Sequence, residues 1–215
     1  MTKQRLKRIL SQVPPNYYEI GVKTNFLQKH WHTRKWHHLK ESFGDIEGKS
    51  LLDIGCADGT TTRQLQKIMP KAKIVGVDYY KSAIDYANKK RSKIKFVCAD
   101  VHDLPFENNS FEIVTAIETL EHLENPKKAL DEIRRVLKPE GYLIIGQDTD
   151  SILFRAIWFI WTMWKGTVWK NSHISCMKPE DLLRVVEKQG FKIEKSKIVN
   201  LGTEIFIKTR KKKRS

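Results

Sequence analysis

Apolar residues along this chain of 215 residues follow two alternating spacings. Short continuous apolar runs, which are typical of strands buried in a sheet, come at residues 51–55, 73–78, 94–99, 112–118 and 142–147. Between these runs apolar residues recur at helical spacing, over residues 60–69, 82–91 and 126–137. A turn is expected to follow the last helix at residues 138–141. The alternation predicts an α/β fold with a mostly parallel sheet and helices on both faces.

Further elements are expected on either side of this core. Residues 14–44 predict an N-terminal helical extension, residues 179–189 a helix, and residues 191–199 and 203–209 a closing hairpin of two strands. The hairpin brings the sheet to seven strands in a single domain. The expected division of the chain is a basic tail and helical cap at 1–45, a cofactor-binding core at 46–150, a Trp-rich insertion at 151–175, a closing helix and strand pair at 176–207, and a basic tail at 208–215.

Glycines mark the point where the first predicted strand meets the first predicted helix. Gly55 and Gly59 lie in the run LLDIGCADG, and glycine lets backbone N–H groups approach a ligand at the N-terminus of a helix. The second strand ends in Asp78, where a carboxylate can accept hydrogen bonds from ribose hydroxyls. The Gly-Lys-Ser/Thr ending of a nucleoside-triphosphate loop is absent, and Ala57 replaces the middle glycine of a dinucleotide loop. The pattern therefore indicates one cleft at the carboxyl ends of adjacent parallel strands and argues against a nucleoside triphosphate as its ligand.

Several stretches together carry a resemblance to a known family. They are residues 51–59, 76–78, 98–100, 104–106 and 111–141. In this order and spacing they resemble the class I S-adenosylmethionine-dependent methyltransferases, of the type 11 group that is similar to ubiquinone-biosynthesis methyltransferases. The resemblance covers residues 46–150 closely and 172–207 more loosely, with Ala57 and Glu112 as departures from the usual residues. It implies a Rossmann-like sheet and S-adenosylmethionine as the cofactor.

The resemblance also implies which residues contact that cofactor. They lie at the ends of the first four predicted strands. Asp53, Gly55 and Gly59 would shape the pocket for the methionine half, Asp78 would bind the ribose hydroxyls, Tyr79 would lie against the adenine, Asp100 with Val101 would bind the adenine edge, and Cys56 and Ile117 complete the expected set.

Candidate catalytic residues follow the fourth predicted strand. Glu118, Glu121 and His122 are spaced so that all three side chains could reach one place on a turn. Carboxylates with an imidazole can bind a divalent cation or act as a general base. The spacing resembles the E-x-x-E-H segment of ubiquinone-biosynthesis O-methyltransferases, where it supports a metal, although the family also carries Glu-His here without one. The three interpretations, a divalent cation, a base and a structural role, stay open, and no residue is assigned as a metal ligand. His173 is a further catalytic candidate.

The net charge of +15 is concentrated near the two ends of the chain. Four cations lie between residues 3 and 8, and six lie between residues 208 and 214, with no acid in either segment. Such ends can bind RNA or an anionic membrane, or can simply be solvated. The three cysteines form no C-x-x-C pair, which excludes the usual disulfide and zinc patterns. No apolar run follows the basic N-terminus, so a cytoplasmic location is expected.

Two segments are unusually rich in aromatic residues. Residues 152–164 are almost entirely apolar, yet thirteen residues are too few to span a bilayer as a helix. Their tryptophans (Trp158, Trp161 and Trp164) suit a membrane interface, a lid over the active site, or a dimer contact. Residues 25–40 are rich in His and Trp without a recognisable metal-ligand spacing, and are expected to form an amphipathic helix over the cofactor pocket.

These features predict a methyltransferase acting on a small, lipophilic acceptor such as a quinone precursor or a lipid headgroup, with peripheral membrane association as one option. An RNA or protein methyltransferase that uses the basic ends is the alternative enzyme, although the Asn/Asp-Pro-Pro-Tyr/Phe motif of amine methylation is absent near residues 116–120. A non-catalytic cofactor-binding subunit is the alternative outside enzymes. The sequence leaves the acceptor and the oligomeric state open.

Overall fold

The computed structural model describes residue 9 and residues 12–90, 92–164, 167–169 and 172–213. One seven-stranded sheet has the strand order β3-β2-β1-β4-β5-β7-β6, in which β7 alone runs antiparallel to its two neighbours. The strands are β1 (Ser50–Ile54), β2 (Lys73–Asp78), β3 (Lys95–Cys98), β4 (Phe111–Ile117), β5 (Leu137–Asp148), β6 (Phe191–Val199) and β7 (Glu204–Lys211). The Rossmann-like, mostly parallel sheet predicted from the sequence is confirmed.

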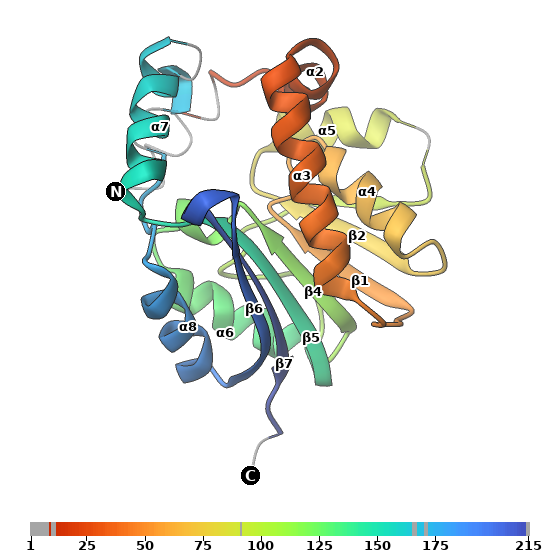
Figure 1. The fold of residues 1–215 in the computed structure, drawn as a ribbon. Helices are drawn as coiled ribbons and strands as arrows, with labels where there is room; N and C mark the ends of the chain where they lie inside the picture. Colours follow the sequence, from red (N-terminus) through yellow and green to blue (C-terminus); the bar gives the residue numbers. More distant parts are fainter. Residues whose placement is uncertain (1–8, 10–11, 91, 165–166, 170–171, 214–215) are drawn as a thin grey trace.

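Helices cover both faces of this sheet (Figure 1). They are α2 (Tyr17–Thr24), α3 (Phe26–Phe43), α4 (Thr60–Ile68), α5 (Lys81–Lys89), α6 (Pro126–Val136), α7 (Ile152–Trp164) and α8 (Pro179–Lys188), with short 3-10 turns η1 (Leu120–His122), η2 (Thr167–Trp169) and η3 (Asn200–Gly202). Apolar side chains of α3, α4 and α5 pack on one face of the sheet, and those of α6 and α8 pack on the other. The central strands are buried on both faces, which explains their continuous apolar runs.

Helix starts follow the local sequence. At α3 the Asn25 side chain accepts hydrogen bonds from the N–H groups of Leu27 and Gln28, and at α6 the Asn125 side chain accepts one from Lys128 at 3.0 Å. Asparagine at this position satisfies N–H groups that have no partner within the helix. The α3 cap fixes where the helix that borders the functional site begins.

Two expected boundaries differ in the structure. The turn expected at residues 138–141 lies within β5, where Glu140 has a φ of 61° and the pairing of β4 with β5 shifts register between Phe111 and Ile113. Strand β7 continues to Lys211, so residues 208–211 of the expected basic tail belong to the sheet. Arg210 forms an ion pair at 2.6 Å with Glu194 on β6. This acidic partner on the neighbouring strand explains why a basic run can extend β7. The expected charges at residues 3–8 and 214 lie outside the described residues.

Within the described residues, no helix has the length and apolar character required to cross a membrane.

Candidate functional site

The loop between β1 and α4 is a tight turn built on two glycines. Gly55 has a φ of 73°, and a Cβ atom there would overlap the Thr119 side chain. Gly59 has a φ of 77° and directly precedes α4 as its N-cap, where a Cβ would lie 2.5 Å from the Phe96 ring. A residue with a side chain is therefore excluded at both positions by backbone conformation and by space.

Asp78, at the end of β2, connects the loop between β1 and α4 to the end of β2 through hydrogen bonds. One carboxylate oxygen accepts the Ala57 N–H at 2.9 Å and the other accepts the Tyr80 N–H at 2.7 Å. Burial raises the pKa of Asp78, although the backbone N–H groups oppose that shift. The carboxylate thus organises the loop and also lines the cavity beside it.

A first cavity of about 170 Å³ lies at the carboxyl ends of β1, β2 and β4. Its wall includes Gly55, Asp78, Tyr79, Asp100 and Val101 from the expected cofactor set. Residues 13–15, Tyr17 and Tyr18 cover it from the N-terminal side. This cover is held because the Tyr80 hydroxyl donates to the Val13 carbonyl at 2.6 Å.

Four residues of the expected cofactor set lie elsewhere. Asp53, Cys56 and Ile117 line a small adjacent pocket of about 30 Å³, and Gly59 lines none of these pockets. The Asp53 carboxylate accepts the hydroxyls of Thr62 and Thr115, both at 2.7 Å, and burial raises its pKa to about 6. Asp53 therefore links β1 to α4 and β4. Burial likewise raises the pKa of the Cys56 thiol.

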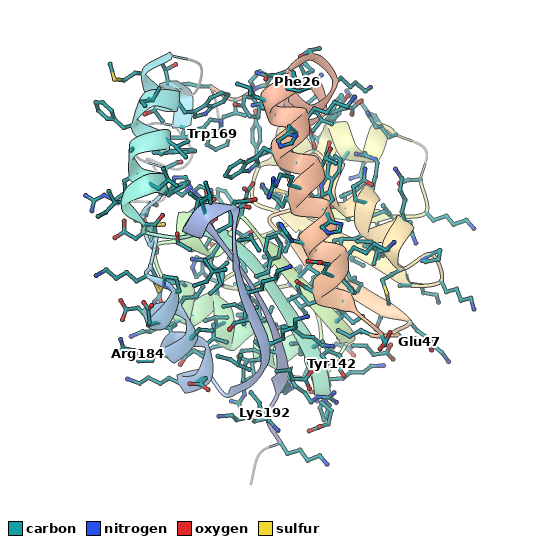
Figure 2. All side chains as sticks on the ribbon, viewed as in Figure 1. Phe26, Glu47, Tyr142, Trp169, Arg184 and Lys192 are labelled. Atoms are coloured by element: carbon teal, nitrogen blue, oxygen red, sulfur yellow. The ribbon has the colours of Figure 1, made fainter. Side chains whose placement is uncertain are left out.

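A second cavity of about 280 Å³ adjoins the first and shares Tyr17, Tyr18, Glu118, His122 and Trp169 with it. Figure 2 shows Trp169 between α7 and the end of the molecule formed by α2 and α3. The remaining walls are largely aromatic and apolar: Leu27, Trp31, Phe154, Ile157, Trp158 and Trp161, with Gln28 beside them. The helix α3 thus borders this second cavity, and its His32 also lines the small pocket that contains Asp53, Cys56 and Ile117.

The floor of the second cavity carries buried charges. Lys35 of α3 forms an ion pair with Glu118, and the carboxylates of Glu118, Asp148 and Glu204 lie within 4.8 Å of one another. Burial disfavours the charged form of Lys35, but the three carboxylates outweigh it and raise its pKa. Burial also opposes ionisation of Glu118, yet Lys35 lowers its pKa to about 2. Both members of the pair are therefore charged at neutral pH.

Two histidines face each other at the junction of the cavities, with ring centroids 4.7 Å apart. Nε2 of His173 lies 3.2 Å from the Asp148 carboxylate, and Nδ1 of His122 lies 3.0 Å from the Ser172 carbonyl. Burial lowers the pKa of both rings to about 4, so both are neutral at pH 7. Each can therefore accept a proton.

The structure separates the Glu118, Glu121 and His122 cluster that the sequence predicts. Glu118 pairs with Lys35, whereas Glu121 is fully buried and accepts the Asp148 N–H at 3.4 Å. Glu121 and His122 instead share a group with His173. Glu118 has a φ of 50° directly after β4, and the 3-10 turn η1 then reverses the chain, so the spacing does not bring the three side chains to one point. The expectation of one shared locus is wrong.

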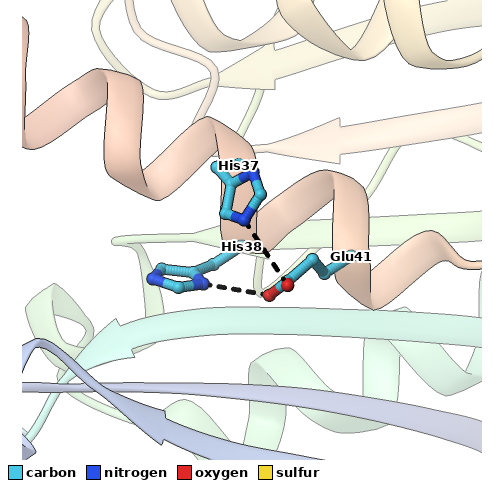
Figure 3. A group of neighbouring side chains, drawn as sticks. All are labelled: His37, His38 and Glu41. Atoms are coloured by element: carbon cyan, nitrogen blue, oxygen red, sulfur yellow. Dashed lines mark hydrogen bonds and ion pairs between the residues drawn. The ribbon is translucent and has the colours of Figure 1, made fainter.

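An exposed group on α3 also brings imidazoles to a carboxylate. Figure 3 shows His37 and His38 directed at Glu41, at 3.4 and 3.1 Å. Lys197 on β6 lies 2.8 Å from the same carboxylate. Glu41 is thus already paired with a lysine, and the group links α3 to the sheet edge.

Sequence reasoning missed Tyr18, Lys35, Asp148 and Glu204. A signal for Lys35 was present, because it lies four and eight residues before Leu39 and Phe43, which are fully buried on the same face of α3. Asp148 and Glu204 lie on β5 and β7, which pair with each other. No spacing in the local sequence indicates that these two carboxylates approach Glu118.

The fold is a Rossmann-like sheet with two adjoining cavities at the carboxyl ends of its strands. A family model described as "Methyltransferase domain" matches residues 52–145. The resemblance to the class I S-adenosylmethionine-dependent methyltransferases that the sequence predicts is confirmed over these residues.

The individual relatives have low sequence identity to this chain. An uncharacterized methyltransferase of Schizosaccharomyces pombe is 32% identical over 139 residues, covering 59% of this chain and 50% of the relative. A demethylmenaquinone methyltransferase of Renibacterium salmoninarum is 28% identical over 151 residues, covering 68% and 63%. The chain thus spans less than two thirds of either. Among solved structures, the PH0226 protein of Pyrococcus horikoshii superposes with a TM-score of 0.73 at 21% identity, covering 94% of this chain and 97% of that one.

Proposed function

We propose that this protein transfers a methyl group from S-adenosylmethionine to a small, lipophilic acceptor with a ring such as that of a quinone precursor. The observation that carries the proposal is the pair of adjoining cavities, one edged by the glycine turn and Asp78, the other lined by aromatic side chains. They share Glu118 and His122, so two ligands bound side by side would meet there. A relative named demethylmenaquinone methyltransferase supports this acceptor class.

The residues of the first cavity fit the cofactor. Gly55 lines this cavity, where its missing side chain gives space to Thr119, and Asp78 offers a carboxylate at a strand end, where such sites bind ribose. When bound, the sulfonium supplies an electrophilic methyl group, so the protein has to align the acceptor and receive its proton. The aromatic walls exclude water and orient a flat ring, and neutral His122 and His173 provide proton acceptors.

The activity is tested with labelled S-adenosylmethionine and a panel of acceptors that includes demethylmenaquinone, simple phenols, ethanolamine derivatives and RNA. Transfer to the ring compounds supports the proposal, and transfer only to RNA or to an amine contradicts it. S-adenosylmethionine binding without transfer to any acceptor would favour the non-catalytic subunit instead. A chelator added to the same assay tests the divalent cation. We expect transfer to be unchanged, because Lys35 pairs with Glu118 and so supplies a cation beside the group of Glu118, Asp148 and Glu204.

Helix α7 has two different apolar faces. Phe154, Trp158 and Trp161 line the second cavity, whereas Ile152, Phe159, Ile160 and Met163 are exposed on the outside. Trp158 and Trp161, for which the sequence leaves a membrane interface, a lid and a dimer contact open, line the cavity. The side chain of Trp164 lies outside the described residues. The exposed set recurs at helical spacing, so it forms one continuous stripe.

We propose that this outer stripe of α7 contacts a membrane that contains anionic lipid. Phe26 and Leu27, at the start of α3, are also exposed, and Leu27 and the α7 residue Ile157 both line the second cavity. Leu27 and Ile157, both exposed, thus border the cavity that would receive a lipophilic acceptor. The chain carries a net charge of +15, and Lys23 and Arg155 are exposed near this end. Apolar side chains and cations together favour an anionic interface.

Co-sedimentation with vesicles of phosphatidylcholine and phosphatidylglycerol tests this contact. Replacement of Phe159, Ile160 and Met163 by Ser should abolish binding, whereas Trp158→Phe with Trp161→Phe, which alters the inner face, should leave it intact. Equal binding by wild type and the triple variant would contradict the proposed surface.

A further inference from the structure

We propose that the carboxylate of Glu118 and the aromatic rings beside it bind the positively charged sulfonium of S-adenosylmethionine, and thereby favour this donor over S-adenosylhomocysteine, whose sulfur carries no charge. The inference deepens the proposed function and rests on it, because it places this cofactor in the first cavity. It makes Glu118 a residue that selects the methyl donor over the product that remains after transfer.

The walls of the first cavity are acidic, although the chain as a whole is basic. The chain carries a net charge of +15, yet among the residues that the structure describes no lysine or arginine lines this cavity. The acids that line it are Asp58, Asp78, Asp100, Glu118 and Glu124. The donor and the product share their adenosine, amino and carboxylate groups, and differ in the methyl group and the charge at sulfur. An acidic cavity therefore attracts the donor more than the product.

The pKa of the Tyr18 phenol reflects the charge at this wall. Tyr18 lines both cavities, and its pKa lies well above the usual value, because burial and next Glu118 raise it, with Asp78 and Asp58 among the smaller contributions. Acids that disfavour a phenolate at this place favour a cation there.

The sulfur has to lie where the two cavities meet, because its methyl group passes from the ligand of one cavity to the ligand of the other. The described residues that line both cavities are Tyr17, Tyr18, Glu118, His122 and Trp169. The centroid of the Trp169 ring lies 5.6 Å from that of Tyr17 and 6.3 Å from that of Tyr18. The faces of such rings attract cations, and aromatic cages bind methylated ammonium groups in this way. A carboxylate beside three aromatic rings therefore fits a sulfonium.

A buried polar atom at the same junction also indicates a polar ligand. Oγ of Ser172 has no hydrogen-bond partner among the described residues, although Ser172 is only 3% exposed and lines the first cavity. The backbone carbonyl of Ser172 lies 3.0 Å from Nδ1 of His122, which places it beside the shared residues. Buried polar atoms without partners are rare in folded proteins. The junction is therefore suited to a polar group and not to apolar contacts alone.

Lys35 keeps the Glu118 carboxylate charged from the side of the second cavity. Burial opposes ionisation of Glu118, but Lys35 lowers its pKa to about 2. The ion pair engages Oε1 of Glu118, and Lys35 lines the second cavity but not the first. Because a carboxylate has two oxygens and accepts several contacts, Glu118 can face an ammonium on one side and a sulfonium on the other.

Glu118 also suits the charge that remains after transfer. In the proposed reaction the acceptor gains the methyl group and gives its proton to an imidazole, while the electrons of the breaking C–S bond stay with sulfur. The positive charge thus moves from sulfur to His122 or His173. Burial lowers the pKa of both rings, and Glu118 opposes that shift. The carboxylate therefore lies beside a cation before and after the step, so its attraction for the donor does not oppose the chemistry.

Calorimetric titration with each ligand separately tests the selection. The wild type should bind S-adenosylmethionine at least about tenfold more tightly than S-adenosylhomocysteine, because the donor alone carries charge at sulfur. Glu118→Gln keeps the size of the side chain and should remove most of this preference, while S-adenosylhomocysteine still binds. Glu180→Gln, at an exposed position of α8, removes the same charge elsewhere and should keep the wild-type ratio.

A double variant, Glu118→Gln with Lys35→Met, separates a contact of Glu118 from the effect of an unpaired Lys35. It removes both members of the ion pair, so its net charge equals that of the wild type. If Glu118 contacts the sulfonium, the double variant should also prefer S-adenosylmethionine less than the wild type does. A wild-type ratio in the double variant would overturn the proposal.

A measurement on the wild type alone covers the case in which the variants do not fold. The probe is the aza analogue of S-adenosylmethionine, in which a methylated nitrogen replaces the methylated sulfur, so that it is charged only when protonated. NMR of its isotope-labelled methyl carbon against pH gives the pKa of the amine. This pKa should be higher in the bound probe than in the free probe by at least about one unit, a tenfold preference for the cation. An equal or lower pKa would contradict the proposal.

The two levels of the argument fail in different ways. Equal affinity of the wild type for S-adenosylmethionine and S-adenosylhomocysteine would overturn the selection by Glu118 and leave the proposed function standing. Binding of neither ligand would overturn the placement of the cofactor, and the proposed function with it.

Discussion

Gly55 holds the backbone in a left-handed conformation at the point where a ligand would approach β1. Gly55→Ala should destabilise the protein by more than about 2 kcal/mol, because it adds left-handed strain to an overlap with Thr119. Gly202→Ala is a suitable control, since Gly202 has a φ of 90° but nothing within 4 Å of the added Cβ. Urea unfolding of both variants measures the difference. Equal losses would mean that Thr119 moves aside without cost.

The Asp78 carboxylate accepts two loop N–H groups, and we propose that it also binds the cofactor. Asp78→Ala should weaken S-adenosylmethionine binding by about 2–3 kcal/mol, since it removes charge-assisted bonds to the ligand and frees two loop N–H groups. Calorimetric titration measures the affinity, with Asp85→Ala on the exposed side of α5 as the control. Wild-type affinity in the Asp78 variant would remove this residue from the site.

Helix α7 illustrates how one element serves two surfaces. Trp158 packs at a ring-centroid distance of 4.1 Å from His173, so Trp158→Ala should loosen both the acceptor and the imidazole beside it. We expect a rise in KM for the acceptor of at least about tenfold, from the loss of a large aromatic contact, with unchanged affinity for S-adenosylmethionine. Steady-state kinetics with both substrates measure this split. Phe159→Ala, on the exposed face, should alter neither value in the absence of vesicles.

The buried carboxylates connect elements from across the molecule. Glu118 follows β4, Asp148 ends β5, Glu204 begins β7, and Lys35 reaches them from α3. A change in the protonation of this group should therefore change the free energy of unfolding of the whole domain, so that its stability depends on pH.

Glu204→Gln tests this dependence. Burial raises the pKa of Glu204 from its usual 4.5 to about 8, so the folded state binds a proton that the unfolded state releases between these values. Its stabilising contribution is complete below pH 4.5 and is lost as the pH rises to 8, by up to about 1.4 kcal/mol per pH unit. The gain in unfolding free energy of Glu204→Gln over wild type should grow across this window and level off above it. Urea unfolding from pH 5 to 9, with exposed Glu187→Gln as the control, measures it.

Most of the sheet could be predicted because its signals are local. Strand β2 lies where the apolar run at residues 73–78 predicts it, and the other parallel strands agree within a few residues. The irregular start of β5 could not be predicted, because Pro139 and Gly141 read locally as a turn while pairing with β4 keeps the segment in the sheet. The continuation of β7 to Lys211 also depends on a distant partner, Glu194.

The site was determined in part by the sequence alone. The glycine turn and the position of Asp78 follow from the sequence, because the strand, the tight turn and the acid at a strand end are encoded within a short stretch of residues. The backbone conformation that each of them requires depends on neighbouring residues. The second cavity was decided only by the tertiary structure. Lys35, Asp148 and His173 come from distant parts of the chain, and burial sets their charges as much as residue type does. A sequence records which groups can ionise, whereas the packing around them decides which ones meet and which stay charged.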